Sequence, residues 1–197
     1  MFQKLNRFLT FVLFFIRIIV FLRKFFAMSN IFLIGYMGTG KTTLGRLLSK
    51  RLDMPFVDLD AYIEGRFFKT VSQIFEEKGE DGFRQIEQAM LQETADFDNT
   101  IVAVGGGTPC FFDNMQVMNE KGLTFFLKTS PETLCKTLSK AKTKRPLIKD
   151  KSDEELFVFI KENLIKREFF YSQAQFTVDM ENNIENIVEE ICRLLTK

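Results

Sequence analysis

The stretch from Gly35 to Thr42 constrains the fold of this chain more than any other. It reads Gly-Tyr-Met-Gly-Thr-Gly-Lys-Thr, which fits the phosphate-binding pattern G-x-x-x-x-G-K-S/T. The apolar run 30–34 before it predicts a buried parallel strand, and residues 43–52 after it carry leucines at helical spacing. A glycine loop between a strand and a helix is the setting in which backbone N–H groups bind phosphate groups.

The residue types in this loop suit phosphate chemistry. The glycines let the backbone approach an anion closely, Lys41 brings a mobile positive charge, and the hydroxyl of Thr42 can ligate magnesium. The alternative is an ordinary glycine turn, which the flanking strand and helix disfavour.

Composition excludes several classes of function. The chain has 197 residues, which is the size of one domain with a possible tail, and its net charge of +1 gives no reason to expect a nucleic-acid partner. It has no histidine, which excludes a Ser-His-Asp triad and the zinc sites that contain histidine. The three cysteines form no C-x-x-C motif, so we expect reduced thiols in a cytoplasmic protein.

Residues 1–27 differ in composition from the rest of the chain. They contain five basic residues, no acidic residue and eight of the 24 phenylalanines. Arg17 interrupts their apolar run, so no uncharged span is long enough for a transmembrane helix. We expect an extension outside the working domain, either an upstream continuation of the reading frame or a tail that targets or contacts a membrane.

Two carboxylates follow a short apolar segment at Phe56-Val57. Asp58 and Asp60 are separated by one residue and come fewer than twenty residues after the glycine loop. One carboxylate can hold magnesium beside Thr42, and the other can act as a base toward an acceptor hydroxyl. The alternative is that Asp58 or Asp60 serves only as a helix cap.

The central part of the chain contains further candidates for a ligand site. Helices are expected from 61, from 70 with Ser72 as a cap, and from a turn at 79–84 onward. Arg84 on the third helix is either a solvated charge or a partner for a substrate carboxylate. A predicted strand at 100–104 ends in three glycines at 105–107, where a ligand can approach the backbone closely.

The carboxyl-terminal third adds a lysine-rich segment and the last elements. Residues 109–121 are predicted to be helical, 123–127 to be a strand, and 139–152 to be a mobile lid whose Arg145 meets the transferring phosphoryl group. A helix over 153–170, a strand over 176–178 and an amphipathic closing helix capped by Asn182 or Asn183 complete the chain. This alternation predicts an α/β fold with a five-stranded parallel sheet and helices on both faces.

Together these residues resemble shikimate kinase from Met28 to about Leu195. The resemblance rests on the glycine loop and on five further motifs in compatible order: Asp58-x-Asp60 followed by Ile63-Glu64, Phe83-Arg84-x-x-Glu87, Gly105-Gly106-Gly107, Arg145-Pro146-Leu147 and Arg167-x-x-x-Tyr171. It implies a three-layer α/β/α fold of the nucleoside-monophosphate-kinase type with sheet order 2-3-1-4-5. It also implies ATP-dependent phosphorylation of the 3-hydroxyl of shikimate, in the biosynthesis of chorismate and the aromatic amino acids.

The resemblance also implies roles for individual residues. Lys41, Asp60 and Arg145 would be catalytic, and Thr42 with Asp58 would hold Mg²⁺. The shikimate site would contain Asp60, Arg84, Gly106 and Arg167. The ATP site would contain Gly38, Thr39, Gly40, Lys41, Thr42, Thr43 and Arg145, with Lys140 as a substitute for an arginine near the adenine.

The resemblance divides the chain into a kinase domain at 28–197, with a shikimate-binding region at about 58–95 and the lid at about 139–152. We expect a monomer whose partners are ATP and shikimate, with membrane contact only through residues 1–27. The main alternative is a kinase of another small acceptor, such as gluconate or a nucleoside monophosphate. A GTP-binding switch is disfavoured because the chain lacks an N-K-x-D sequence, and an inert interaction domain because the charged residues of all the motifs are present.

Overall fold

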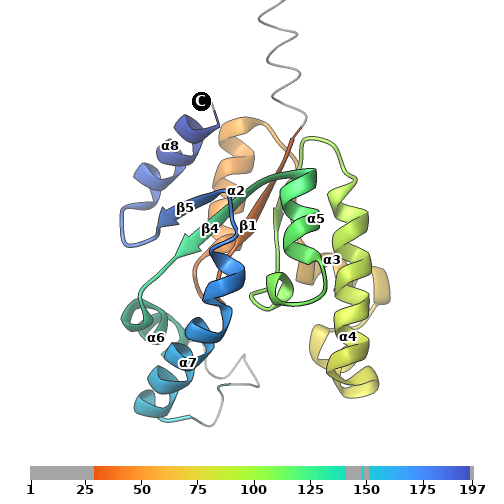
Figure 1. Cartoon of the computed structure of the whole chain (residues 1–197), viewed down its shortest axis with the longest axis vertical. Helices are drawn as coiled ribbons and strands as arrows, with labels where there is room; N and C mark the ends of the chain where they lie inside the picture. The colour runs from red at the N-terminus through yellow and green to blue at the C-terminus, as the bar shows by residue number, and fades with distance from the viewer. Residues whose placement is uncertain (1–28, 141–147, 149–150, 196–197) are drawn as a thin grey trace, which may run out of the picture.

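Strand β1 (Asn30–Ile34) is the centre of the sheet, and all of its residues are buried. It pairs in parallel with β3 (Ile101–Ala103) and β4 (Gly122–Lys128), while β2 (Phe56–Asp58) and β5 (Phe176–Asp179) form the edges. The structure is a computed structural model that describes residues 29–140, 148 and 151–195 (Figure 1). Within these residues the strand order is β2-β3-β1-β4-β5, which confirms the expected topology.

Alternate residues of β1 face two different hydrophobic cores. Ile31 and Leu33 pack on one face with residues of α2 (Lys41–Leu52) and α8 (Ile184–Leu194). Phe32 and Ile34 pack on the opposite face, which is covered by several other helices. Those helices are α3 (Leu59–Phe67), α4 (Val71–Ala95), α5 (Asn114–Lys121) and α7 (Asp153–Tyr171). A strand buried on both faces requires apolar residues at successive positions, which explains the continuous apolar run in the sequence.

A third, smaller core lies beyond the carboxyl end of the sheet. Helix α6 (Pro131–Ser139) and helix α7 share it with Tyr36 of the glycine loop, whose side chain is fully buried. Ser130 caps α6 and Pro131 occupies its first turn, as the sequence predicts. The glycine loop is therefore packed against helices that come about one hundred residues later in the chain.

Helix α4 corrects two expectations. Residues 71–95 form one kinked helix, because Gly79 alone departs from helical geometry, with φ 69° and ψ −177°. The cap is Thr70 and not Ser72. The Thr70 hydroxyl accepts a hydrogen bond from Gln73 N, and Gln73 Oε1 accepts one from Thr70 N. The turn predicted at 79–84 is thus a kink at one residue, after which the helix continues.

The predicted helix at 109–121 is also divided. A short 3₁₀ helix, η1 (Thr108–Cys110), is followed by an extended Phe111 and by Phe112 at a positive φ of 51°, before α5 begins at Asn114. Asn183 caps α8, in agreement with the sequence. Across the described part of the chain, none of the helices has the length and apolar content needed to cross a membrane.

Candidate active site

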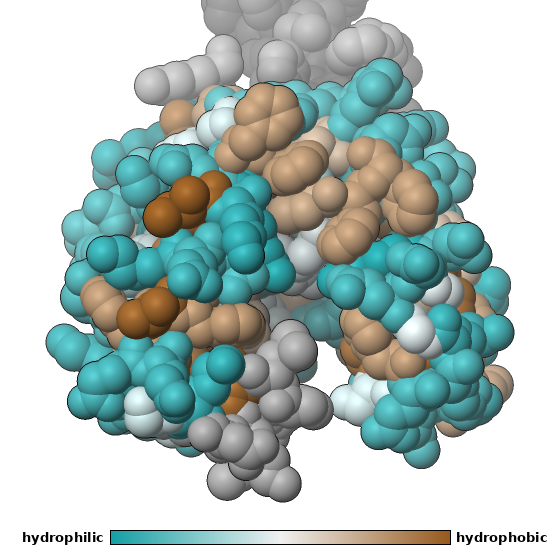
Figure 2. Space-filling model, turned by 60° about the horizontal axis from the view of Figure 1, so that its bottom comes forward, coloured by the Kyte–Doolittle hydropathy of each residue, from teal (hydrophilic) through white to brown (hydrophobic). Residues whose placement is uncertain are grey.

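The carboxyl ends of the parallel strands meet at one end of the molecule, which Figure 2 shows as a recess between two flanks. The glycine loop follows β1 at this end. Gly38 and Gly40 both have φ 86°, a backbone conformation that residues other than glycine rarely adopt. The Lys41 ammonium donates to Gly35 O at 2.7 Å and to Tyr36 O at 2.9 Å, so the loop curves around it. This geometry is that of a phosphate-binding loop.

Thr42 and Asp58 lie side by side although sixteen residues separate them. The Thr42 hydroxyl donates to Asp58 Oδ2 at 2.6 Å, and Asp58 Oδ1 caps α3 by accepting from Ala61 N at 3.4 Å. Asp58 is therefore both a helix cap and the partner of the loop threonine. The two oxygen groups suit Mg²⁺, which prefers oxygen ligands and binds one or two protein groups together with phosphates. The described residues contain no group of three or more acidic or cysteine side chains that would enclose a metal.

Asp60 lies in the first turn of α3, with its side chain exposed on the recess side of β2. Desolvation by the surrounding protein, with repulsion from Asp58 and Glu87, raises its pKa from 3.8 to about 6. The positive charge of Lys41 acts in the opposite direction. Asp60 is thus within electrostatic range of the glycine loop, and its shifted pKa is typical of a carboxylate placed to exchange a proton.

Arg84 is held in one orientation by acidic side chains of its own helix. It donates to Glu87 Oε2 at 2.8 Å and to Glu80 Oε1 at 3.1 Å, and its guanidinium lies 4.0 Å from the centre of the Phe111 ring. Glu87 is 1% exposed and also accepts from the Thr108 hydroxyl at 2.5 Å. With only 12% of its side chain exposed, Arg84 is a constrained group of the site and not a solvated charge.

The three glycines after β3 bring these groups together. A side-chain carbon added to Gly105 would lie 3.2 Å from Asp60 Oδ1, and one added to Gly107 would lie 2.9 Å from an Arg84 nitrogen. A side-chain carbon on Gly106 would lie 3.0 Å from the backbone nitrogen of Met37 in the glycine loop. The Gly105–Gly107 segment therefore contacts the loop, the second strand end and α4 at once, and it has no room for side chains.

Arg167 approaches the same segment from α7. Its guanidinium donates to Gly106 O at 3.0 Å and lies 5.1 Å from the centre of the Tyr36 ring. Burial raises the pKa of the Cys110 thiol, while the positive charges of Arg167 and Arg84 act to lower it. Both arginines thus flank the thiol of Cys110, although they come from helices on opposite sides of the recess.

The structure describes the positions of all the residues expected in the site except Arg145. Asp58, Asp60, Arg84, Gly106 and Arg167 border one recess with the glycine loop; Arg145 lies outside the described residues. Lys140 is the carboxyl-terminal cap of α6. The sequence reasoning assigned no role to Glu87, Thr108 or Tyr171, although Glu87 and Tyr171 lie one helical turn from Arg84 and Arg167.

Comparison with known proteins identifies the family. A sequence model of the family described as shikimate kinase matches residues 37–196. A shikimate kinase of Parabacteroides distasonis is 51% identical over 171 residues, which are 86% of this chain and 99% of that protein.

Solved structures agree with this match. The 1.7 Å crystal structure of shikimate kinase from Bacteroides thetaiotaomicron has 48% identity and a TM-score of 0.82, covering 86% of this chain and 99% of that one. A shikimate kinase from Acinetobacter baumannii, solved in complex with shikimate, has 30% identity and a TM-score of 0.79, covering 88% and 96%. The strand order, the glycine loop and the sequence identity agree, and the chain belongs to the shikimate kinase family.

Proposed function

We propose that this protein transfers the γ-phosphoryl group of ATP to the 3-hydroxyl of shikimate. The observation that supports this most directly is the position of Gly105–Gly107, which contacts the phosphate loop on one side and the Asp60 and Arg84 side chains on the other. An acceptor held against these glycines lies next to the phosphates of a nucleotide in the loop. Positioning of this kind accounts for much of the rate enhancement in phosphoryl transfer.

The acceptor site is built for a carboxylate and several hydroxyls. Arg84 and Arg167 supply guanidinium groups from two sides, and paired N–H groups of this kind bind carboxylates in bidentate geometry. Shikimate carries one carboxylate for these arginines and hydroxyls that Asp60 and the Gly106 backbone can bind. Glu87 prevents Arg84 from turning away, since it holds one guanidinium nitrogen at 2.8 Å.

The nucleotide site is assigned to the loop and the start of α2. The backbone of the loop binds the phosphates, and Lys41 leaves its carbonyl partners to neutralise the outer phosphate oxygens. Arg145 is assigned to the phosphoryl group during transfer. The residues that hold ATP are Gly38, Thr39, Gly40, Lys41, Thr42, Thr43 and Arg145.

Thr42 and Asp58 are assigned to Mg²⁺ on the basis of their adjacent oxygen atoms. Bound by these two residues, Mg²⁺ would reduce the negative charge that opposes attack on the phosphoryl group. Asp60 orients the acceptor hydroxyl and receives its proton, because its pKa of about 6 leaves it ionised at neutral pH while close to the operating range.

The kinase domain is assigned to residues 28–197, with the acceptor-binding region at about 58–95 and the lid at about 139–152. The match of the family to residues 37–196 supports this division. The protein is proposed to act as a cytoplasmic monomer on ATP and shikimate, with residues 1–27 outside the catalytic domain.

The decisive experiment measures ADP release by the purified protein with ATP, Mg²⁺ and one acceptor at a time. Shikimate, gluconate and the nucleoside monophosphates are compared, with product identity checked by mass spectrometry. Turnover with shikimate that exceeds turnover with the other acceptors by at least about 10²-fold in kcat/KM is expected. Turnover with gluconate or a monophosphate, but not with shikimate, would contradict the proposal.

The variant Arg84→Ala tests the acceptor site separately. Loss of one charged partner of a carboxylate is expected to raise KM for shikimate by about 10–100-fold while KM for ATP changes less than about twofold. Arg193→Ala, an exposed arginine of α8 that pairs with Glu189, is the matched control and should change neither constant. Equal increases in both KM values for Arg84→Ala would place Arg84 outside the acceptor site.

A further inference from the structure

The carbonyl of Gly106 accepts two hydrogen bonds from the same helix. The Tyr171 hydroxyl donates to it at 2.6 Å and Arg167 Nη1 donates at 3.0 Å. The two donors are four residues apart and therefore lie on one face of α7. The role assigned to Arg167 in carboxylate binding leaves the contribution of Tyr171 to be explained.

Tyr171 is held more rigidly than Arg167. Its side chain is 1% exposed, and its ring stacks on Phe126 of β4 with centroids 5.0 Å apart and an interplanar angle of 28°. Burial raises the pKa of the Tyr171 phenol, so the hydroxyl remains protonated and able to donate. Arg167 has a longer side chain and must direct its guanidinium toward the carboxylate when an acceptor binds.

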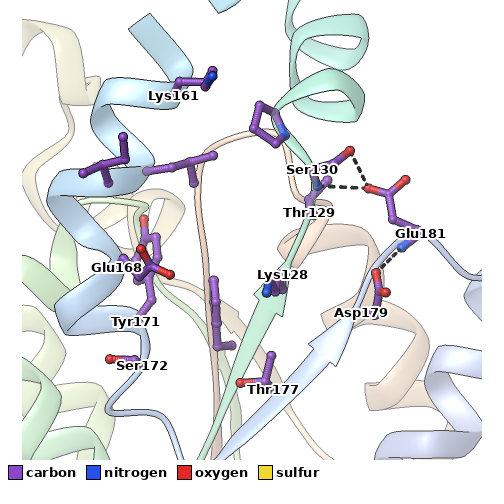
Figure 3. Close-up of a pocket in the computed structure, with 14 residues that line it drawn as sticks. Lys128, Thr129, Ser130, Lys161, Glu168, Tyr171, Ser172, Thr177, Asp179 and Glu181 are labelled. Carbon is purple, nitrogen blue, oxygen red and sulfur yellow. Dashed lines mark hydrogen bonds between the residues drawn. The ribbon is translucent and has the colours of Figure 1, made fainter. Parts of the chain in front are cut away.

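The Tyr171 hydroxyl is, beside Arg167, a direct hydrogen-bonded connection between α7 and the glycine segment. Figure 3 shows Tyr171 in the wall of a groove of about 630 Å³ between α7 and strands β4 and β5. Among the described residues, the other groove residues that Figure 3 labels, such as Lys161, Glu168 and Thr177, are not hydrogen-bonded to the glycine segment. Because the peptide unit is planar, a hydrogen bond to Gly106 O also fixes the direction of the following N–H group, that of Gly107.

We propose that Tyr171 is a positioning residue for the acceptor, whose hydroxyl keeps the Gly105–Gly107 segment in its binding conformation while Arg167 engages the carboxylate. Gly105 and Gly107 contact Asp60 and Arg84, so rotation of the Gly106 peptide would disturb both sides of the acceptor site. This role rests on the proposed function, since the acceptor it positions is shikimate. The glycine loop also lies against Gly106, since a side-chain carbon built there would meet Met37 N at 3.0 Å and Gly35 O and Tyr36 C at 3.4 Å. The Tyr171 hydroxyl bonds to the Gly106 carbonyl, whose neighbours Gly105 and Gly107 face the acceptor groups, so acceptor binding depends on Tyr171 more than ATP binding does.

The variant Tyr171→Phe keeps the ring and its stacking on Phe126 and removes only the hydroxyl. We expect KM for shikimate to rise about tenfold, the equivalent of one lost hydrogen bond, with KM for ATP within about twofold of wild type. Ser172→Ala is the matched control, because it removes a hydroxyl at the adjacent position that donates to Phe169 O at 3.0 Å and not to the glycine segment. Its KM for shikimate should equal that of the wild type.

Calorimetric titration with shikimate alone provides a second measurement, and circular dichroism establishes that each variant is folded. Weaker shikimate binding by Tyr171→Phe and not by Ser172→Ala supports the role. Wild-type turnover of shikimate with an unchanged KM in Tyr171→Phe overturns the positioning role alone. A wild-type protein that does not turn over shikimate overturns the proposed function and this role with it.

Discussion

At the scale of single residues, two carboxylates separated by one position perform different tasks. Asp58 is fixed between the Thr42 hydroxyl and the first turn of α3, whereas the Asp60 carboxylate has no hydrogen bond within the described part of the chain and faces the recess. Desolvation by the surrounding protein, together with repulsion from Asp58 and Glu87, raises the pKa of Asp60 to about 6, above that of an ordinary aspartate. We therefore propose that the motif Asp-x-Asp combines a structural group that can also hold magnesium with a proton acceptor.

The raised pKa of Asp60 predicts a stability effect as well as a catalytic one. The folded protein holds this proton more tightly than the unfolded chain, so the free energy of unfolding falls as pH rises from 3.8 to about 6. Asp60→Asn should therefore abolish turnover yet raise the free energy of unfolding at pH 7.5 by about 1 kcal/mol. This figure is reduced from about 3 kcal/mol because water screens an exposed carboxylate.

Denaturant unfolding without metal, at pH 7.5 and near pH 4, measures this effect. The gain of Asp60→Asn should shrink toward the lower pH, because pH 4 lies well below the folded-state pKa of about 6 and the wild-type carboxyl is then already protonated in the folded protein. Asp98→Asn is the control. Asp98 is an exposed carboxylate that precedes β3, at the end of the strand opposite to the three glycines, and its replacement should show no such gain. A gain that is the same at both pH values would contradict this explanation.

Lys41 provides the second residue-scale prediction. Its ammonium is bonded to carbonyls of the loop, and it is not part of any hydrophobic core. Lys41→Ala should therefore lower kcat by at least about 10²-fold, while the far-UV circular dichroism spectrum stays that of the wild type. Lys50→Ala, an exposed lysine near the end of the same helix, should retain full activity. Unfolding of the Lys41 variant would show that the side chain also supports the fold.

At the scale of elements, α4 depends on one residue for its shape. Gly79 combines φ 69° with ψ −177°, a region open almost only to glycine, and it separates the first part of the helix from the part that carries Arg84 and Glu87. The kink thus sets the direction from which the acceptor-binding arginine enters the site. The sequence predicted a turn here with a new helix after it, but it could not show that the break is confined to one residue, because that depends on how α4 packs against α3 and α5.

Gly79→Ala tests the importance of this kink. A side chain in this conformation is expected to lower the free energy of unfolding by about 1–3 kcal/mol and to raise KM for shikimate. Gly65→Ala in α3 is the control, since Gly65 lies within regular helix with open space around it. The control should raise stability by up to about 1 kcal/mol through better helix propensity. Thermal unfolding of both variants is followed by circular dichroism. Equal changes in the free energy of unfolding for the two variants would contradict a special role for Gly79.

At the scale of the whole molecule, the first residue of β1 joins elements that lie far apart in the sequence. Asn30 bonds to Ala95 O at 2.9 Å and accepts from Thr100 N at 2.8 Å, which joins the start of β1 to the end of α4 and the start of β3. Asn30 therefore connects the amino-terminal end of the central strand to the α4–β3 connection.

Residues 28–197 produced alone should fold and keep kcat and both KM values within about twofold of the full chain. Residues 33–197 are the matched control and should fail to fold, because they lack Asn30 and the buried Ile31 and Phe32 of the central strand. Steady-state kinetics and thermal unfolding make the comparison. Loss of activity in residues 28–197 would assign a catalytic or structural role to the amino-terminal extension.

The sequence by itself determined the features that depend on neighbouring residues. The glycine loop, the strands and most helices with their caps follow from residue types a few positions apart, and so the fold and the family were predictable. The exceptions, Thr70 as cap and the division of 109–121, arise where two local signals compete.

Only the tertiary structure decided which distant residues meet. Glu87 of α4 bonds to Thr108 of η1, and Tyr171 of α7 bonds to Gly106 across 65 residues of chain. These contacts connect separate elements through space, and no spacing along a single element encodes them. The recess exists because parallel strands place their carboxyl ends at one edge, where side chains far apart in sequence converge on three glycines.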